Sequence, residues 1–362
     1  MNSTIPYQRI LITGGAGFIG SRLAIHLKTS FPQTQVVVMD NMIRAGSELH
    51  LSHLQEHGVE FIKGDIRNSD DLKKIDGDLL IACAAEPSVL AGVGSSPRYV
   101  IETNLNGTLE SLEWARERGA GFFFFSSSRV YPLDRVRAIP YVERESRLEW
   151  TTPGDELSSF LSKDGITLDF PTEGIRSMYG TTKLASEELI REYASAYDIP
   201  SIITRFGVVS GPGQMGQVQQ GFVSFWVAKH FFSGSLSYNG FGGTGKQVRD
   251  FLHVRDLCTL VSRQLAVLPQ CRGELYQAAG GKDFSVSLRE LTQLCQEVMG
   301  MKVKIKENPE SHQNDLPILL LDSARVRDEF SWKPQVSARQ LVEEIHTWLI
   351  ENEKDLKALF CK

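Results

Sequence analysis

The chain lacks the features that mark membrane, secreted or nucleic-acid-binding proteins. Its net charge is −5, so no basic excess favours a nucleic-acid partner. It contains no apolar run of about 18 residues, and we therefore expect no membrane-spanning helix. Residues 1–8 lack the charged start and apolar core of a secretory signal. These absences predict a cytoplasmic protein with neither nucleic acid nor a membrane as a partner.

The sequence also has few cysteines and no clear set of metal ligands. Its five cysteines are scattered and include no C-x-x-C pair, which predicts reduced thiols rather than a disulfide framework or a zinc site. His50, His53 and His57 stand three and four positions apart among polar residues, which favours a solvent-exposed helix face over a metal site. Residues 240–247 nearly match an ATP-binding loop, but Gln247 stands where a Ser or Thr must bind Mg²⁺. We expect no metal.

A glycine-rich turn lies near the start of the chain. The apolar residues 10–12 predict a strand before the turn, and Leu23, Ala24 and Leu27 predict an amphipathic helix after it. The free N–H groups and positive end of such a helix face a pyrophosphate in dinucleotide-binding proteins. The pattern therefore predicts dinucleotide binding. The candidate residues are Gly14, Gly17, Phe18, Ile19 and Gly20.

An acid at the end of the second predicted strand selects the dinucleotide. Residues 35–40 form a short apolar strand that ends at Asp40, twenty positions beyond Gly20. An acid at this spacing accepts the adenine-ribose hydroxyls and repels a ribose 2′-phosphate. The sequence thus predicts NAD and not NADP, with a surface Asp at a strand end as the alternative interpretation. Arg44 could suggest NADP, but it follows Asp40 and does not replace it.

Further strands and helices alternate along the chain. Strands are predicted at residues 59–65, 78–85, 121–125 and 201–205, and helices at residues 99–118 and 179–197. This alternation predicts an α/β fold with a Rossmann doubly wound parallel sheet. Asp65 ends the third strand and is placed either to reach the adenine amino group or to cap a helix that starts near Ser69. The small residues Ala84 and Ala85 allow a cofactor to lie against the end of the fourth strand.

The chain is predicted to form two domains with an insertion. We assign residues 1–205 to an NAD-binding Rossmann domain, to which residues 249–275 return. Residues 206–248 and 276–362 are assigned to a smaller C-terminal α/β domain that binds the substrate. Residues 134–176 are polar, rich in Pro, Gly, Asp and Glu, and weakly periodic. We interpret this insertion as a lid or substrate loop over the site.

Tyr179 and Lys183 form a pair suited to acid–base chemistry. They stand four positions apart and so lie on the same side of a helical turn. A phenol with a pKa near 10 is a poor base at neutral pH. A neighbouring lysine cation and the positive charge of nicotinamide stabilise the phenolate and lower that pKa. The serines at 126–128 follow a buried strand, where ligand sites of parallel sheets collect, and one of their hydroxyls can bond a sugar oxygen that becomes a carbonyl.

Together these motifs resemble the extended short-chain dehydrogenases/reductases, in particular their nucleotide-sugar epimerase/dehydratase group. The motifs occur in the family's order over essentially the whole chain, at residues 13–20, 40–41, 64–67, 126–131, 179–183, 248–256, 315–317 and 332–334. The resemblance implies that Ser127, Tyr179 and Lys183 are catalytic and that Lys183 also binds the nicotinamide ribose. It implies a homodimer formed through residues 104–118 and 179–197. The further cofactor-binding residues that it implies are Asn41, Asp65, Ile66, Ala84, Ala85 and Asn104.

The residues after Ser127 favour one reaction of this group. Dehydratases of the family carry Asp-Glu there and the UDP-glucuronate decarboxylases carry Glu, whereas this chain has Ser128 and Arg129. The resemblance therefore implies an NAD-dependent epimerase of a nucleotide-activated sugar, which acts by transient oxidation to a keto-sugar and re-reduction on the opposite face. Within the group the motifs are most similar to those of CDP-paratose (CDP-tyvelose) 2-epimerases and then UDP-hexose 4-epimerases. A sugar-nucleotide dehydratase or reductase, or a non-catalytic NAD-sensing protein, are the alternatives.

One departure from the family concerns the substrate. Ser127, Ser128 and Arg129 are candidates to contact it, and Arg249 matches an arginine that binds the diphosphate in the family. A second diphosphate-binding arginine is missing, because residues 311–315 read Ser-His-Gln-Asn-Asp. The sequence leaves open whether His312 replaces it. The nucleotide, the sugar and the carbon that is epimerised also stay open.

Overall fold

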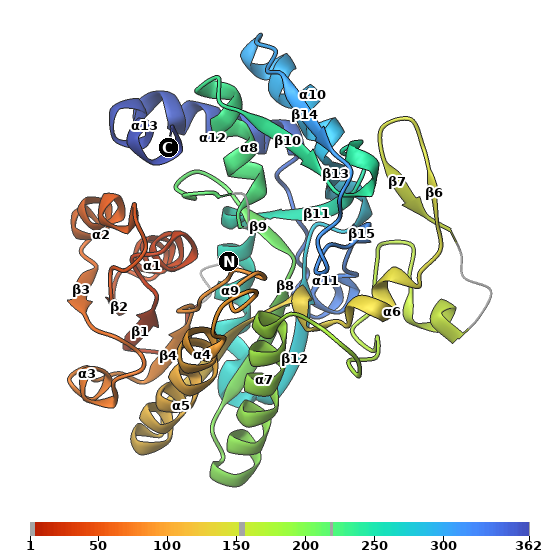
Figure 1. Ribbon diagram of the computed structural model, residues 1–362. Helices are drawn as coiled ribbons and strands as arrows, with labels where there is room; N and C mark the ends of the chain where they lie inside the picture. The colour runs from red at the N-terminus through yellow and green to blue at the C-terminus, as the bar shows by residue number, and fades with distance from the viewer. Residues whose placement is uncertain (1–3, 152–155, 218–219, 362) are drawn as a thin grey trace. The chain divides into compact units, whose positions relative to one another are not determined.

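The computed structural model describes residues 4–151, 156–217 and 220–361, which form two compact units (Figure 1). The first unit comprises Met1–Val130, Ser177–Arg205 and Leu257–Tyr276. The second comprises Tyr131–Arg176, Phe206–Asp256 and Gln277–Lys362. Residues 131–176 thus pack with the second unit, whereas the sequence placed them in the first domain. The assignment of NAD to one unit and of substrate to the other stays a prediction.

The first unit is built on a seven-stranded sheet in the described part of the chain. Its order is β12 (Arg272–Ala278), β8 (Ser201–Phe206), β5 (Gly121–Ser127), β4 (Leu79–Ala82), β1 (Arg9–Thr13), β2 (Gln35–Asp40) and β3 (Glu60–Lys63). The pairs β4–β5, β4–β1, β1–β2 and β2–β3 are parallel. The strand order reverses between β1 and β4, and ligands of such sheets bind outside the carboxyl ends of the strands at this point.

Helices cover the sheet of the first unit. They are α1 (Phe18–Ser30), α2 (Leu51–Glu56), α3 (Ser69–Lys73), α4 (Arg98–Ile101), α5 (Gly107–Arg118), α7 (Met178–Tyr197) and most of α9 (Val254–Val267). A π-helical turn, Glu102–Asn106, joins α4 to α5. Phe122 and Phe124 pack in one cluster with Leu112 of α5 and Ile190 of α7, while Phe123, between them, is equally buried. Burial on both faces explains why these strands are apolar without alternation, and it confirms the predicted doubly wound α/β fold.

The second unit contains smaller sheets and a group of helices. Strand β11 (Val248–His253) pairs with β9 (Val208–Ser210), β13 (Ser285–Ser287) and β15 (Ile318–Leu319), and β10 (Leu236–Asn239) pairs with β14 (Ile305–Asn308). Helices α8 (Phe222–Phe231), α10 (Leu288–Met299) and α12 (Ala338–Glu351) pack against one another. Helices α11 (Ala324–Phe330) and α13 (Glu353–Phe360) also belong to this unit. None of the helices in the described ranges is long and apolar enough to cross a membrane.

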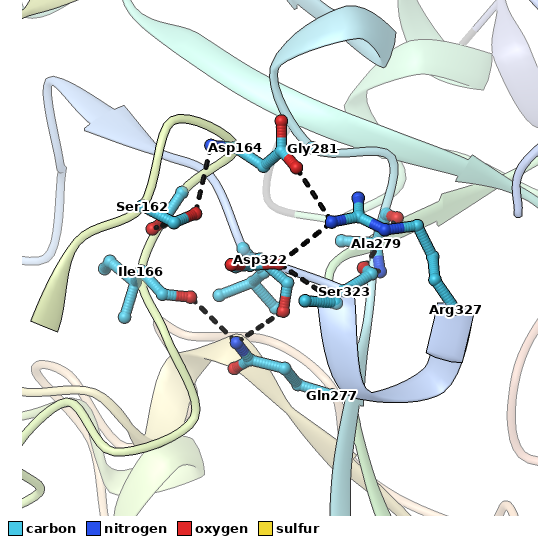
Figure 2. A network of polar contacts seen from close by, with 12 residues as sticks. Ser162, Asp164, Ile166, Gln277, Ala279, Gly281, Asp322, Ser323 and Arg327 are labelled. Atoms are coloured by element: carbon cyan, nitrogen blue, oxygen red, sulfur yellow. Dashed lines mark hydrogen bonds and ion pairs between the residues drawn. The ribbon is translucent and has the colours of Figure 1, made fainter. Parts of the chain in front are cut away.

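The insertion at residues 134–176 contains regular structure and is anchored within the second unit. It includes the end of α6 (Leu133–Arg137) and an antiparallel hairpin of β6 (Tyr141–Glu143) and β7 (Leu148–Trp150). The amide of Gln277 donates to the carbonyls of Ile166 and Asp322, each at 2.7 Å (Figure 2). Arg327 contacts Asp164 at 2.9 Å. The insertion is therefore fixed to the C-terminal part of its own unit at these points, and its action as a lid stays a prediction.

Candidate functional site

The glycine turn of the first unit is closed by backbone packing that admits no side chain. Gly14 has a φ of +67°, and a Cβ there would lie 2.7 Å from the Ala84 backbone. A Cβ on Gly20 would lie 2.3 Å from the carbonyl oxygen of Gly14. The turn thus brings the ends of β1 and β4 together, and α1 begins immediately after it at Phe18. A tight glycine turn that leads into a helix with no side-chain cap at its N-terminus fits the pyrophosphate of a dinucleotide.

Asp40 is attached to this turn. Its carboxylate accepts hydrogen bonds from the backbone N–H of Ala16 at 3.1 Å and of Met42 at 2.9 Å. The acid is thereby held at the glycine turn, at the carboxyl end of β2. Arg44 contacts Glu86 at 3.8 Å. The position of Asp40 suits the ribose-binding role predicted for it, and that role stays a prediction.

The neighbouring candidates Asn41, Asp65 and Ile66 are held by contacts with other parts of the first unit. Asp65 accepts hydrogen bonds from the Arg67 guanidinium at 2.7 and 2.9 Å and from Asn41 at 3.0 Å, and the bond to Arg67 chiefly lowers the pKa of this carboxyl far below its usual range. Ile66 is buried and packs where Gly107 has no side chain. The alternative of Asp65 as a helix cap is wrong, because Asn68 caps α3 by accepting from the N–H of Asp70.

His50 supports the glycine turn, although the sequence predicted an exposed histidine. Its Nδ1 lies 3.0 Å from the Ala16 carbonyl and 3.1 Å from the Ser21 hydroxyl, and the side chain is buried. The cause is local: a short 3₁₀ turn, Ser47–His50, precedes α2 and directs His50 inwards, whereas His53 and His57 are exposed. Among the described residues no group of three His, Cys, Asp or Glu side chains could hold a metal ion.

Asn104 holds the segment that follows β4. It lies in the π-helical turn, accepts the N–H of Glu86 at 2.7 Å and donates to the carbonyl of Glu86 at 3.0 Å. Its amide also reaches the hydroxyl of Thr182 on α7 at 3.2 Å. Residues 83–86, which include Ala84 and Ala85, are therefore fixed beside the glycine turn. Asn104 can position the backbone there whether or not it also contacts the cofactor.

Ser127 and Tyr179 lie together at the end of β5. Their side chains share a hydrogen bond, and the Ser127 hydroxyl also accepts the N–H of Arg129 at 3.2 Å. Ser177 caps the helix α7 on which Tyr179 stands. Burial raises the pKa of the Tyr179 phenol, and the bond to Ser127 and the charge of Arg129 partly oppose this rise. In the protein alone, Lys183 does not lower the pKa of Tyr179 as expected. Burial outweighs the favourable contacts, and the cation that opposes its effect on the phenol is Arg129.

Lys183 is buried one helical turn from Tyr179. Its ammonium donates to the carbonyl of Phe125 at 2.7 Å and lies 4.4 Å from the centre of the Phe124 ring. Burial lowers the pKa of Lys183 to about 8, against smaller opposing effects of Cys83 and Glu187. The structure thus brings Ser127, Tyr179 and Lys183 to one edge of the sheet in the first unit.

A buried ion pair, missed in the sequence, supports this edge. Glu187 and Arg205 are almost fully buried, and the guanidinium contacts the carboxylate at 2.6 and 3.0 Å. Ser126, the residue before Ser127, donates to the same carboxylate at 2.5 Å. The four-residue spacing of Lys183 and Glu187 placed both on one helix face, but no local pattern identified Arg205 as the partner.

The candidates Arg249 and His312 lie in the second unit. Arg249 donates to the carbonyls of Val248 and Leu316, both at 2.7 Å. The N–H of Asn314 donates to His312 Nδ1 at 3.2 Å. This contact holds the imidazole within its own turn.

The comparisons with known proteins agree with this geometry. The family model described as "NAD dependent epimerase/dehydratase family" matches residues 10–276. A CDP-paratose 2-epimerase of Salmonella typhi is 29% identical over 354 residues, which cover 94% of this chain and 99% of the relative. A UDP-glucose 4-epimerase of Erwinia amylovora is also 29% identical, with 95% and 98% covered. The solved structure of a DesIV double mutant, a dTDP-glucose 4,6-dehydratase from Streptomyces venezuelae with NAD bound, superposes with a TM-score of 0.77 at 25% identity, covering 97% of this chain and all of the other.

The match spans most of the chain and includes the glycine turn, the serines after β5 and the Tyr179–Lys183 pair. It agrees with the fold and with a glycine turn suited to a dinucleotide. The chain belongs to the NAD dependent epimerase/dehydratase family, an enzyme family of the extended short-chain dehydrogenase/reductase type, and its cofactor is NAD.

Proposed function

We propose that the protein is an NAD-dependent epimerase of a nucleotide-activated sugar, similar to CDP-paratose 2-epimerases. The observation that carries this proposal is the edge of β5, where Ser127 bonds Tyr179 and is followed by Ser128 and Arg129. No carboxylate follows Ser127 to act as the acid or base of an elimination. Transient oxidation and re-reduction of a sugar alcohol needs only the groups that are present.

In this proposal Tyr179 exchanges the proton of the reacting sugar hydroxyl. It accepts that proton as the carbon is oxidised and returns it as the carbon is reduced. Ser127 donates a hydrogen bond to the same sugar oxygen and keeps it beside the phenol. Arg129 stabilises the phenolate, which opposes the rise in pKa that burial causes. Ser128 and Arg129 contact the sugar.

The cofactor is assigned to the first unit. When bound, NAD would supply the hydride acceptor and donor for oxidation and re-reduction of the sugar carbon. The glycine turn would hold its pyrophosphate, Asp40 its adenine ribose and Lys183 its nicotinamide ribose. The other residues proposed to contact it are Phe18, Ile19, Asn41, Asp65, Ile66, Ala84, Ala85 and Asn104. We assign the nucleotide sugar to the second unit through Arg249, and we propose a cytoplasmic homodimer.

A second candidate is a UDP-hexose 4-epimerase. The Erwinia amylovora relative, named UDP-glucose 4-epimerase, is as identical to this chain as the CDP-paratose 2-epimerase is. Both reactions use the same proton and hydride chemistry, so the residues of the first unit do not choose between them. A dehydratase or reductase is the third candidate, because relatives named dTDP-glucose 4,6-dehydratase match at 25% identity.

The proposal is tested with a panel of CDP-, UDP-, GDP- and dTDP-sugars in D₂O, followed by NMR. An epimer without solvent deuterium at the inverted carbon is the expected product, because the hydride returns directly. Deuterium at that carbon would show deprotonation and contradict the mechanism. A deoxy keto-sugar as the final product would identify a dehydratase. Absorbance of the denatured enzyme's supernatant should show released NAD⁺ or NADH.

A further inference from the structure

The turn at residues 311–315 has no arginine of its own, but an arginine from a distant element reaches it and a second reaches the residue that follows it. Arg249 of β11 donates from Nη2 to the Leu316 carbonyl at 2.7 Å. Arg137 of α6 donates to the Asp315 carbonyl from Nε at 3.0 Å and from Nη2 at 2.7 Å, and Nη2 also reaches the Gln313 carbonyl at 2.5 Å. Two guanidinium groups are therefore held on adjacent peptide carbonyls.

Hydrogen bonds within the turn position the carbonyls that Arg137 contacts. The carboxylate of Asp315 accepts the N–H of His312 at 2.8 Å, and the N–H of Asp315 donates to the His312 carbonyl at 2.9 Å. Directly after the turn, the carbonyl of Pro317 accepts the N–H of Val248 at 2.9 Å, and β15 then pairs with β11.

The charge of Arg137 is available to a ligand. Its three hydrogen bonds go to carbonyl oxygens, which do not neutralise a guanidinium, and within the described ranges it makes no ion pair with a carboxylate. The side chain is exposed, and Nη1 takes part in none of these bonds. A second cation, Arg249, contacts the next carbonyl along the chain, that of Leu316. An anion with two negative groups offers one to each guanidinium.

We propose that Arg137 supplies the second guanidinium of the diphosphate-binding site, beside Arg249, in place of an arginine within residues 311–315. The inference rests on the proposed function, since it requires a nucleoside diphosphate in the substrate. The insertion then has a chemical role, because α6 lies at its start and carries a residue that binds the substrate. His312 keeps its imidazole within the turn.

The test compares Arg137→Ala with Arg135→Ala in the full-length protein. Arg135 is a matched control, because it lies on the same helix and donates to a backbone carbonyl, that of Glu173 at 2.8 Å. Binding of CDP, UDP, GDP and dTDP is measured by calorimetry at several salt concentrations, with the matching monophosphates. We expect Arg137→Ala to weaken diphosphate binding by about tenfold or more and to reduce its salt dependence, because a charged contact is lost. Arg135→Ala should stay within about twofold of wild type.

The outcomes separate this inference from the proposed function. If Arg137→Ala binds diphosphates like Arg135→Ala, the inference is wrong and the proposed function stands. An equal loss for mono- and diphosphates with unchanged salt dependence would show that Arg137 only holds the turn, which also overturns the inference. If wild type binds none of the four diphosphates, the nucleotide-sugar function itself fails. Should Arg137→Ala not fold, as judged by circular dichroism, Arg137→Lys retains the charge and should give an intermediate loss of affinity.

Discussion

The two units of the chain differ in how their candidate residues are held. In the first unit the residues identified from motifs bind one another or nearby backbone, as Asp40 binds Ala16, Asn104 binds Glu86 and Lys183 binds Phe125. In the second unit the turn at residues 311–315 departs from the family's motif; Arg137 of α6 contacts the turn and Arg249 of β11 contacts the following residue, Leu316. In both units the contacts join separate segments, but local motifs identify the candidate residues of the first unit, whereas Arg137 is identified only through its contacts with a distant segment.

The largest effect is expected at the reacting hydroxyl of the first unit. Tyr179→Phe removes the group that exchanges the proton, so turnover should fall by about 10²–10⁴-fold while NAD stays bound. Turnover is followed by NMR and bound cofactor by absorbance after denaturation. Thr181→Ala, an exposed position on the same helix, should retain activity. Near-normal turnover by Tyr179→Phe would contradict the assignment of chemistry to this motif.

The next effect concerns the buried ion pair beneath that motif. Glu187→Gln leaves the Arg205 charge buried without its partner, and the free energy of unfolding should fall by about 3–5 kcal/mol. The adjacent Glu188 is the control, because its pair with Arg191 is exposed and Glu188→Gln should cost less than about 1 kcal/mol. Denaturant unfolding followed by circular dichroism measures both. Equal losses of unfolding free energy in the two variants would show that the buried pair contributes no more to stability than the exposed pair.

A smaller effect is expected from the second unit, and on binding rather than chemistry. Arg249→Ala should raise KM for the nucleotide sugar by about 10–100-fold with little change in kcat, because the contact is made equally in the bound substrate and during the reaction. Steady-state kinetics separates the two constants. A fall in kcat at unchanged KM would mean that the second unit also takes part in the chemistry, and the contrast between the units would disappear.

The smallest effect is a change in pH dependence in the first unit. Arg129 lowers the pKa of Tyr179, so Arg129→Gln should raise that pKa. The base form then appears at higher pH, and the rising limb of the pH profile of kcat should move upwards by up to about one pH unit. Profiles of the variant and wild type, measured between pH 6 and 10 in steps of about half a unit, would reveal the change. A profile that keeps its position would show that Arg129 does not act on the phenol.

Much of the first unit could be predicted from the sequence, because its signals are local. The run of apolar residues in β2 and β5, the glycine turn and the four-residue spacing of Tyr179 and Lys183 each depend on neighbouring positions. What could not be predicted depends on contacts across the fold. His50 is turned inwards by a 3₁₀ turn, and Arg205 meets Glu187 only when β8 lies beside α7. The packing of residues 131–176 with the second unit likewise depends on Gln277 and Arg327, more than a hundred positions away.

The π-helical turn at Glu102–Asn106 has a consequence for the evolution of this helix. A π turn accommodates one more residue than an α-helical turn, so the side chains before and after it follow two different registers. Leu112 and Ala115 of α5 can then face the sheet while Asn104 faces the Glu86 backbone. Deleting one residue from the turn would leave a single α-helical register. Either Leu112 and Ala115 would then turn away from the sheet, or Asn104 would turn away from the Glu86 backbone. We therefore expect homologous chains to tolerate substitutions in this segment but not insertions or deletions. The number of residues in the turn is constrained more strongly than their identity.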